Sequence, residues 1–253
     1  QLTSNQPNQF IRKYLFWTSN VIEARKSEKH VHNAAAKILE IYREKHQTED
    51  SSKNKSVDYL IDRINAHEYP SDTHRLSEII TFIIAGHETS TNTLSFFLYE
   101  LGRNISCQRK LQKELDEVPL DEPNALLSLN QITKLEYLNN CLKESMRLWP
   151  TAPAVRRSTL KDISYEGFDI PAGRLVQCNF YSMFRQPWIY KPNEYIPERW
   201  MTEFYSELQS EGKEEVTVEQ LNHLKDMFMP FALGHRNCIG QNMAMVQLRL
   251  IVA

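Results

Sequence analysis

A ten-residue segment near the C-terminal end limits what this chain can be more than any other stretch. It runs from Phe231 to Gly240 and places a single cysteine, Cys238, among two glycines, an arginine and a phenylalanine. Glycine allows the backbone to approach a flat ligand closely. The residues from Gln241 onward predict a helix, whose N-terminal end favours a thiolate. We interpret Cys238 as the axial ligand of a haem iron; considered alone, it would more often be a buried, inert cysteine.

Composition excludes several other classes of protein. The 253 residues are 41% hydrophobic and 25% charged, which suits a globular chain with a sizeable core. The net charge of −2 argues against a nucleic-acid partner. No apolar run approaches the roughly 18 residues that span a bilayer. The four cysteines form no Cys-x-x-Cys pair, so neither a zinc site nor a disulfide framework is indicated, and a reducing compartment is favoured.

Hydrophobic periodicity predicts a mainly α fold with a small β-sheet (α+β). Two helices are expected between about residue 9 and residue 48, and a short helix over 57–64. Later helices are expected over 73–101, where Gly102 would be the C-cap, and over 108–118, 137–149 and 241–253. Strands are expected at 154–155, 163–165, 168–170 and 175–178, with a turn at Glu166-Gly167. Residues 119–130 are expected to form a loop, and the acidic stretch 202–226 a surface loop or helix.

The long helix contains a run of residues that disfavour helix, from Ala85 to Thr93. The summed propensity penalty is roughly 3 kcal/mol. It follows a segment, Ile79 to Ala85, that we expect to be buried on all sides. Glu88 and Thr89 together offer an acid–alcohol pair able to pass protons into a dry pocket, and Thr89 can bond back to the carbonyl of Ala85. A helix kink with a solvated polar patch explains the run equally well.

Two Glu–Arg pairs recur in the second half of the chain. Glu144 and Arg147 are three residues apart, so they share one face of a helix, and Glu198 is followed directly by Arg199. A guanidinium has five donors in a fixed arrangement, enough to join a carboxylate to several carbonyls. Taken alone, each pair is more simply an exposed salt bridge of little energetic value.

At this point the motifs match a known family. The pattern Phe231-x-x-Gly234-x-Arg236-x-Cys238-x-Gly240 resembles the haem-binding loop of the cytochrome P450 monooxygenases. The run from Ala85 to Ser90 resembles the family's oxygen-activation segment. Glu144-x-x-Arg147 resembles its Glu-x-x-Arg helix, and Pro197 to Trp200 the motif that supplies the second arginine of a Glu–Arg–Arg triad. All four occur in the family's order.

The resemblance implies a haem cofactor, iron protoporphyrin IX, with Cys238 as its thiolate ligand. Phe231 would shield the sulfur, and the backbone around Gly234, Ile239 and Gly240 would surround it. The remaining contacts to the haem would come from Arg236 and Arg157 at the propionates, with Arg156 the less favoured neighbour, and from Ala85 over the haem face.

The resemblance also separates catalytic from structural residues. Glu88 and Thr89 would deliver protons to dioxygen at the haem. Glu144, Arg147 and Arg199 would lock the core behind the haem rather than take part in chemistry.

The match also predicts how much of the family is present. Residues 1–253 would be a partial P450 haem domain, from the helices before the long central helix to the start of the helix after the haem loop. The N-terminal half, with any membrane anchor, and the C-terminal tail would lie outside it. Phe184 stands where many relatives have a histidine, which puts a secondary contact in question.

The implied function is that of a haem-thiolate monooxygenase. It would insert one atom of O2 into a small apolar organic substrate, using electrons from a reductase. The resemblance suggests the endoplasmic reticulum membrane, reached only through an N-terminal anchor absent from this chain. Two alternatives remain: a haem-thiolate peroxide isomerase or dehydratase, which the Glu88-Thr89 pair disfavours, and a non-catalytic truncated product. We expect residues 1–253 alone to be inactive and to hold haem weakly.

Overall fold

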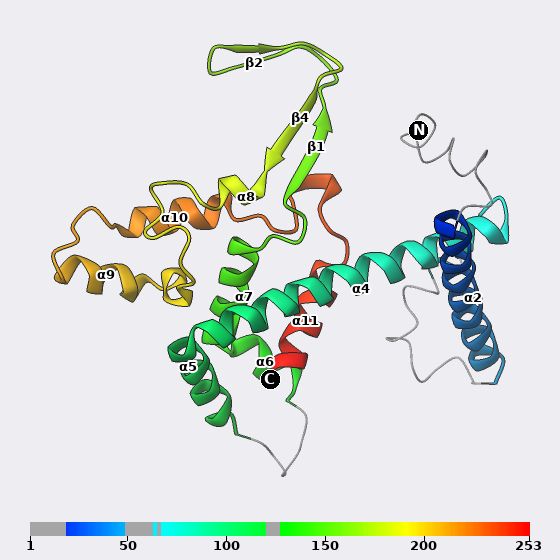
Figure 1. The fold of residues 1–253 in the computed structure, drawn as a ribbon, viewed down its shortest axis with the longest axis horizontal. Coiled ribbons are helices and arrows are strands. Elements are labelled where there is room, and N and C mark those ends of the chain that lie inside the picture. Colours follow the sequence, from blue (N-terminus) through cyan, green and yellow to red (C-terminus); the bar gives the residue numbers. More distant parts are fainter. Residues whose placement is uncertain (1–18, 49–62, 65–66, 120–126) are drawn as a thin grey trace. The chain divides into compact units, whose positions relative to one another are not determined.

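The longest element is helix α4 (Asp72–Arg103), which belongs to two compact units divided between Ala85 and Gly86 (Figure 1). The computed structural model describes residues 19–48, 63–64, 67–119 and 127–253. The helix continues through the polar run without a break. It also continues past Gly102, so the predicted C-cap is wrong: this glycine lies in the last helical turn and does not adopt a positive φ.

The first unit contains helix α2 (Ser19–Thr48) and the first half of α4. Its core consists of Ala35 and Leu39 from α2, Ile79 from α4, and Ile64. Two helices were expected before residue 48. Instead, α2 spans all apolar positions from Val21 to Tyr42, because nothing between them breaks a helix. The predicted helix before residue 19 and most of the one at 57–64 lie outside the described residues.

One burial prediction in α4 is wrong. The segment from Ile79 to Ala85 was expected to be buried on all sides, but Ile84 is 49% exposed and Ala85 is also exposed. Ile79 alone in this segment is deeply buried, at 5% exposure, where it packs against Ala35 and Leu39. Within the part of the chain that the structure describes, only one face of this segment is covered.

The second unit is built around helix α7 (Glu136–Leu148), which is buried along most of its length. Around it lie α5 (Ile105–Asp116), α6 (Leu129–Lys134) and α11 (Gln241–Val252). One apolar cluster joins these helices to the second half of α4, and its fully buried members include Phe97, Ile132, Leu138 and Leu142. The glutamate Glu114 of α5 accepts backbone N–H bonds from Tyr137 and Leu138 at 2.7 and 2.8 Å. This carboxylate supplies the α7 N-cap that Leu135, at the cap position, cannot provide.

Helix α6 begins at the end of the predicted loop 119–130 and was not itself predicted. Its start carries a capping box, in which Ser128 and Gln131 satisfy each other's backbone N–H groups. The same motif, Thr217 with Gln220, starts α10 (Val218–Met227) in the acidic stretch, after α9 (Thr202–Ser210). Both signals were present in the sequence.

The predicted strands form two separate antiparallel pairs. Strand β1 (Ala154–Ser158) pairs with β4 (Leu175–Asn179), and β2 (Ile163–Tyr165) pairs with β3 (Phe168–Ile170). The β2–β3 turn is Glu166-Gly167, with φ of 48° and 83°, as expected for a two-residue hairpin turn. Short helices α8 (Phe180–Met183), η1 (Pro197–Trp200) and η2 (Gly234–Arg236) complete the unit.

The fold class is confirmed: the chain is mainly helical with small antiparallel sheets. Within the described ranges, no helix has both the length and the apolar character required to cross a membrane.

Candidate cofactor-binding site

The cysteine segment forms a series of tight turns that ends at the first turn of α11. Its backbone bonds run from Ala232 N to Met229 O at 2.9 Å, and from Cys238 N to Phe231 O at 2.9 Å. Gly240 is the N-cap of α11. Cys238 therefore lies two residues before this N-cap, where the unpaired helix amides and the helix dipole favour a thiolate.

Two residues of the segment have left-handed backbone conformations. Gly234 has φ of +77° and Ala232 has φ of +59°. A Cβ on Gly234 would meet no atom within 4 Å, so this glycine is required by its φ and not by crowding. A Cβ on Gly240 would lie 3.9 Å from the Cys238 Sγ, in the space beside the thiol. This is an ordinary van der Waals distance, and Gly240 leaves the side of the thiol without even that contact.

The surroundings of the thiol fit a large, flat, anionic and partly apolar group. Cys238 is an exposed free cysteine. Near it in sequence, Leu233, Ile239 and Met243 are 65, 83 and 60% exposed, an unusual amount of free apolar surface for one short segment. Arg236 is exposed, and its side chain makes no ion pair or hydrogen bond with the parts of the chain that the structure describes. A haem has a porphyrin face for the apolar side chains and propionates for this guanidinium.

In the same unit, Glu144 of α7 binds both arginines of the predicted triad. Arg147 donates through Nη2 to Glu144 Oε1 at 2.9 Å and through Nε to Oε2 at 3.0 Å. Arg199 of η1 donates through Nε to Oε1 at 2.7 Å. All three side chains are 0% exposed. The exposed salt bridge that each pair suggested in isolation is therefore not what the structure contains.

The two guanidiniums also bind backbone carbonyls of the irregular 184–194 segment. Arg147 Nη1 donates to the carbonyls of Phe184 and Pro192 at 2.9 and 2.7 Å. Arg199 Nη1 donates to Tyr190 O at 2.6 Å. The triad therefore orders a segment that has little regular structure of its own.

Burial and charge act in opposite directions on Glu144. Burial by itself would raise the pKa of its carboxyl group, but the charges of Arg199 and Arg147 and the hydrogen bond from Ile196 N hold that pKa below its ordinary value. The group is therefore ionised at neutral pH, as the triad requires.

Two sets of contacts in this region were not predicted from the sequence. The indole Nε1 of Trp200 donates to Glu144 Oε2 at 3.0 Å. Arg185 packs over the Tyr181 ring at 3.8 Å and donates to the carbonyl of Leu148, at the end of α7. The hydrogen bonds to Glu144 and Leu148 join residues 56 and 37 positions apart, so no local pattern reveals them. Tyr181 and Arg185 are only four residues apart, a spacing that was visible in the sequence.

The predicted catalytic pair lies on an exposed part of α4, in the same unit as the cysteine segment. The apolar cluster that includes Leu94 and Phe97 of α4 also includes Phe231, so this half of α4 and the cysteine segment share one core. The hydroxyls of Thr91 and Thr93 bond back to the carbonyls of His87 and Thr89 at 2.8 and 2.9 Å. The expected bond from the Thr89 hydroxyl remains a prediction.

The two candidate propionate ligands lie in β1 and are exposed. Arg156 Nε donates to Gln177 Oε1 of β4 at 2.7 Å, and Arg157 Nη1 donates to the carbonyl of Arg156 at 2.8 Å. Arg156 is thus held by a side chain of its own sheet, while Arg157 has only a contact to the neighbouring backbone. The preference for Arg157 stays a prediction.

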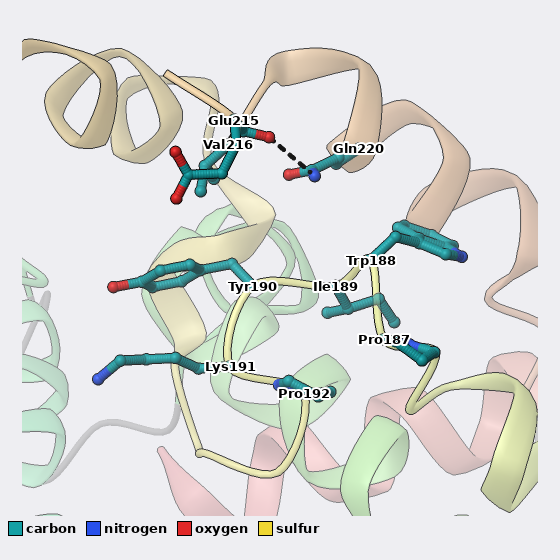
Figure 2. A pocket seen from close by; sticks show the side chains of 9 residues that line it. All are labelled: Pro187, Trp188, Ile189, Tyr190, Lys191, Pro192, Glu215, Val216 and Gln220. Atoms are coloured by element: carbon teal, nitrogen blue, oxygen red, sulfur yellow. Dashed lines mark hydrogen bonds between the residues drawn. The ribbon is translucent and has the colours of Figure 1, made fainter. Parts of the chain in front are cut away.

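A pocket of about 440 Å³ lies elsewhere in the second unit (Figure 2). Trp188, Tyr190 and two prolines form one side. Another side is formed by Val216, in the loop before α10, and by Gln220, in the first turn of α10. Gln220 Nε2 donates to the carbonyl of Glu215 at 3.1 Å (Figure 2). None of the predicted site residues lines this pocket, so it is separate from the cysteine segment.

A mainly helical unit with a cysteine before a helix N-terminus, backed by a buried Glu–Arg–Arg cluster, defines a haem-thiolate type of protein. A sequence model of the family described as Cytochrome P450 matches residues 2–253. The chain therefore belongs to the cytochrome P450 family, whose cofactor is haem bound through a cysteine thiolate.

Three relatives illustrate the similarity. Cytochrome P450 4d2 of Drosophila melanogaster is 32% identical over 184 residues, covering 72% of this chain and 34% of the relative. Cytochrome P450 3A2 of Rattus norvegicus is 32% identical over 221 residues, covering 83% and 40%. Cytochrome P450 3A5 of Homo sapiens is 34% identical over 188 residues, covering 73% and 34%. The chain thus spans between a third and two fifths of the length of these relatives.

Proposed function

We propose that this chain forms the cysteine-ligand part of a haem-thiolate monooxygenase. The reaction takes an apolar C–H substrate, O2, two electrons and two protons to the hydroxylated product and water. The observation that carries the proposal is Cys238: an exposed thiol two residues before the N-cap of α11, with the exposed Arg236 two residues before it in sequence.

When bound, haem supplies an iron whose cysteine ligand donates electron density that favours cleavage of the O–O bond. Cys238 provides the thiolate, and the amides at the start of α11 stabilise its negative charge. Phe231 shields the sulfur from water. Arg236 and Arg157 would bind the propionates, and Ile239 with the backbone at Gly234 and Gly240 would line the site around the sulfur.

By resemblance to the family, Ala85 would contact the haem, and Glu88 and Thr89 of α4 would supply protons. The carboxyl group takes protons from solvent, which suits its exposed position. The Thr89 hydroxyl passes them inward, since a hydroxyl both donates and accepts hydrogen bonds. Glu144, Arg147 and Arg199 hold the 184–194 backbone and do not touch the reacting atoms.

The finer assignments rest on family membership. We propose a small apolar organic substrate, an electron-donating reductase and a position at the endoplasmic reticulum membrane. A requirement for reductant separates this function from that of a peroxide isomerase or dehydratase, which needs neither O2 nor electrons.

Carbon-monoxide difference spectroscopy of the reduced full-length protein tests the ligand. We expect a thiolate-type Soret band that is lost completely in Cys238→Ala. The half-buried free cysteine Cys178 provides the matched control, because Cys178→Ala removes a thiol outside the segment. Retention of the band in Cys238→Ala, or its loss in Cys178→Ala, would contradict the assignment.

A further inference from the structure

Trp200 lies between the buried triad and the start of the cysteine segment. Its side chain is 5% exposed, and its Nε1 is 3.0 Å from Glu144 Oε2. On the other side, its ring centroid is 4.7 Å from that of Phe228. Trp200 therefore contacts both the carboxylate of the triad and the residue that follows the last turn of α10.

The indole N–H completes the hydrogen bonding of Glu144. Oxygen Oε1 accepts three bonds, from Arg147 Nη2, Arg199 Nε and Ile196 N. Oxygen Oε2 accepts two, from Arg147 Nε and Trp200 Nε1. Without the indole donor, a carboxylate oxygen with no access to water would keep a single partner, which is unfavourable in a buried site.

Phe228 connects this contact to the cysteine. It is the C-cap of α10, and the cysteine segment begins three residues later, at Phe231. Its ring also contacts Phe184 at 5.3 Å, and Arg147 holds the carbonyl of that phenylalanine. Three residues beyond Phe228, the carbonyl of Phe231 accepts the Cys238 N–H at 2.9 Å. The path from Trp200 to the cysteine backbone is therefore one ring contact, a short stretch of chain and one hydrogen bond.

We propose that Trp200 is a positioning residue for the cysteine ligand: it anchors Phe228 to the triad and thereby fixes the segment that presents Cys238. The proposal rests on the proposed haem-thiolate function. It predicts that loss of the indole N–H loosens the thiolate ligation before it loosens the fold.

The test compares two tryptophans whose indole N–H groups each donate a hydrogen bond to a glutamate carboxylate. Trp200→Phe removes the N–H and keeps an aromatic ring against Phe228. The control is Trp149→Phe, because Trp149 Nε1 also donates to a carboxylate, Glu100 Oε1, at 2.7 Å. The ring of Trp149 packs against the rings of Phe96 and Tyr99. Phe228→Leu is a second test variant that weakens the ring contact without touching the triad.

Each variant of the haem-loaded full-length protein is exposed to increasing urea. The thiolate-type carbon-monoxide band reports ligation, and far-UV circular dichroism reports the fold. We expect Trp200→Phe and Phe228→Leu to lose the band at a lower urea concentration than the wild type does, and well before helix content falls. In the wild type and in Trp149→Phe, the two signals should fall together.

Coincident loss of both signals in Trp200→Phe and Phe228→Leu would overturn the positioning role, and so would an early loss of the band in Trp149→Phe. If the wild-type protein itself shows no thiolate-type band, the proposed function fails and this inference fails with it. The wild-type spectrum therefore distinguishes the two failures.

Discussion

At the level of single residues, the cysteine segment depends on backbone conformation as much as on the thiol. The sequence suggested that Gly234 gives a ligand close access, but its φ of +77° is itself a reason for glycine. Ala232, at φ of +59°, adopts the left-handed region without being glycine, which costs roughly 1–2 kcal/mol. The backbone of the segment is therefore strained close to Cys238 in sequence.

Gly234→Ala should lower the free energy of unfolding by about 1–2 kcal/mol, because it places a Cβ in the left-handed region. Gly102→Ala is the matched control: neither added Cβ would meet an atom within 4 Å, and Gly102 is helical. The control should raise stability by up to about 1 kcal/mol. Urea unfolding measures both variants, and effects of the same sign would contradict this explanation.

The proposed proton path depends on the hydroxyl of Thr89. Thr89→Ala should leave substrate binding and reductant consumption largely intact but lower the yield of product per reductant, with hydrogen peroxide released instead. Thr91→Ala is the control, since its exposed hydroxyl bonds back to the carbonyl of His87. The measured quantity is the ratio of product formed to reductant consumed. Unchanged coupling in Thr89→Ala would remove this hydroxyl from the path.

At the level of elements, the triad joins α7 to η1 and to the irregular 184–194 segment. The folded-state pKa of Glu144 lies below its unfolded value. Its contribution to stability is therefore complete above the unfolded pKa, about 4.3, and is lost as the pH falls through the lower folded-state pKa. Acid should thus release the 184–194 segment from α7.

Glu144→Gln should lower the free energy of unfolding by about 3–5 kcal/mol at neutral pH, because it leaves two buried guanidiniums without a counter-charge. It should also flatten the fall in stability of the wild type below about pH 4. The control is Glu194→Gln, whose ion pair with Lys191 is exposed and worth less than about 1 kcal/mol. Urea unfolding across a pH series provides the measurement. An equal decrease in the free energy of unfolding in both variants would contradict the larger contribution expected of the buried triad.

At the level of the whole molecule, the chain forms two compact units and covers only part of its relatives' length. The residues around Cys238 leave much apolar surface exposed, with Ile239 at 83%. Within the parts of the chain that the structure describes, this apolar surface is therefore left uncovered.

Residues 1–253 alone should therefore retain haem weakly. Purified chain mixed with haem should lose most of it to an excess of a haem-scavenging protein, whereas the full-length protein should keep it. Cys238→Ala in the full-length background controls for loss of the ligand itself. The measured quantity is the rate at which haem absorbance moves to the scavenger, and equal rates for the two wild-type lengths would contradict the expectation.

The sequence by itself determined the mainly helical class, the strands, the hairpin at Glu166-Gly167 and the family. These depend on local periodicity, turn residues and closely spaced motifs, which are visible along the chain. It missed α6, although the Ser128–Gln131 capping box was a local signal. The apolar positions before residue 48 form two separate groups, so they predicted two helices where the structure has the single helix α2.

Only the tertiary structure decided which pairs are buried and what they hold. Glu144–Arg147 and Glu198–Arg199 have the same appearance in sequence, yet Glu144 binds Arg199 with no exposure while Glu198 binds Lys110 and Tyr137 nearer the surface. The role of Trp200 depends on Glu144 and Phe228, which lie far from it along the chain. The free energy of an ion pair or an indole hydrogen bond depends on its exclusion from water, and that exclusion is created by packing between distant segments.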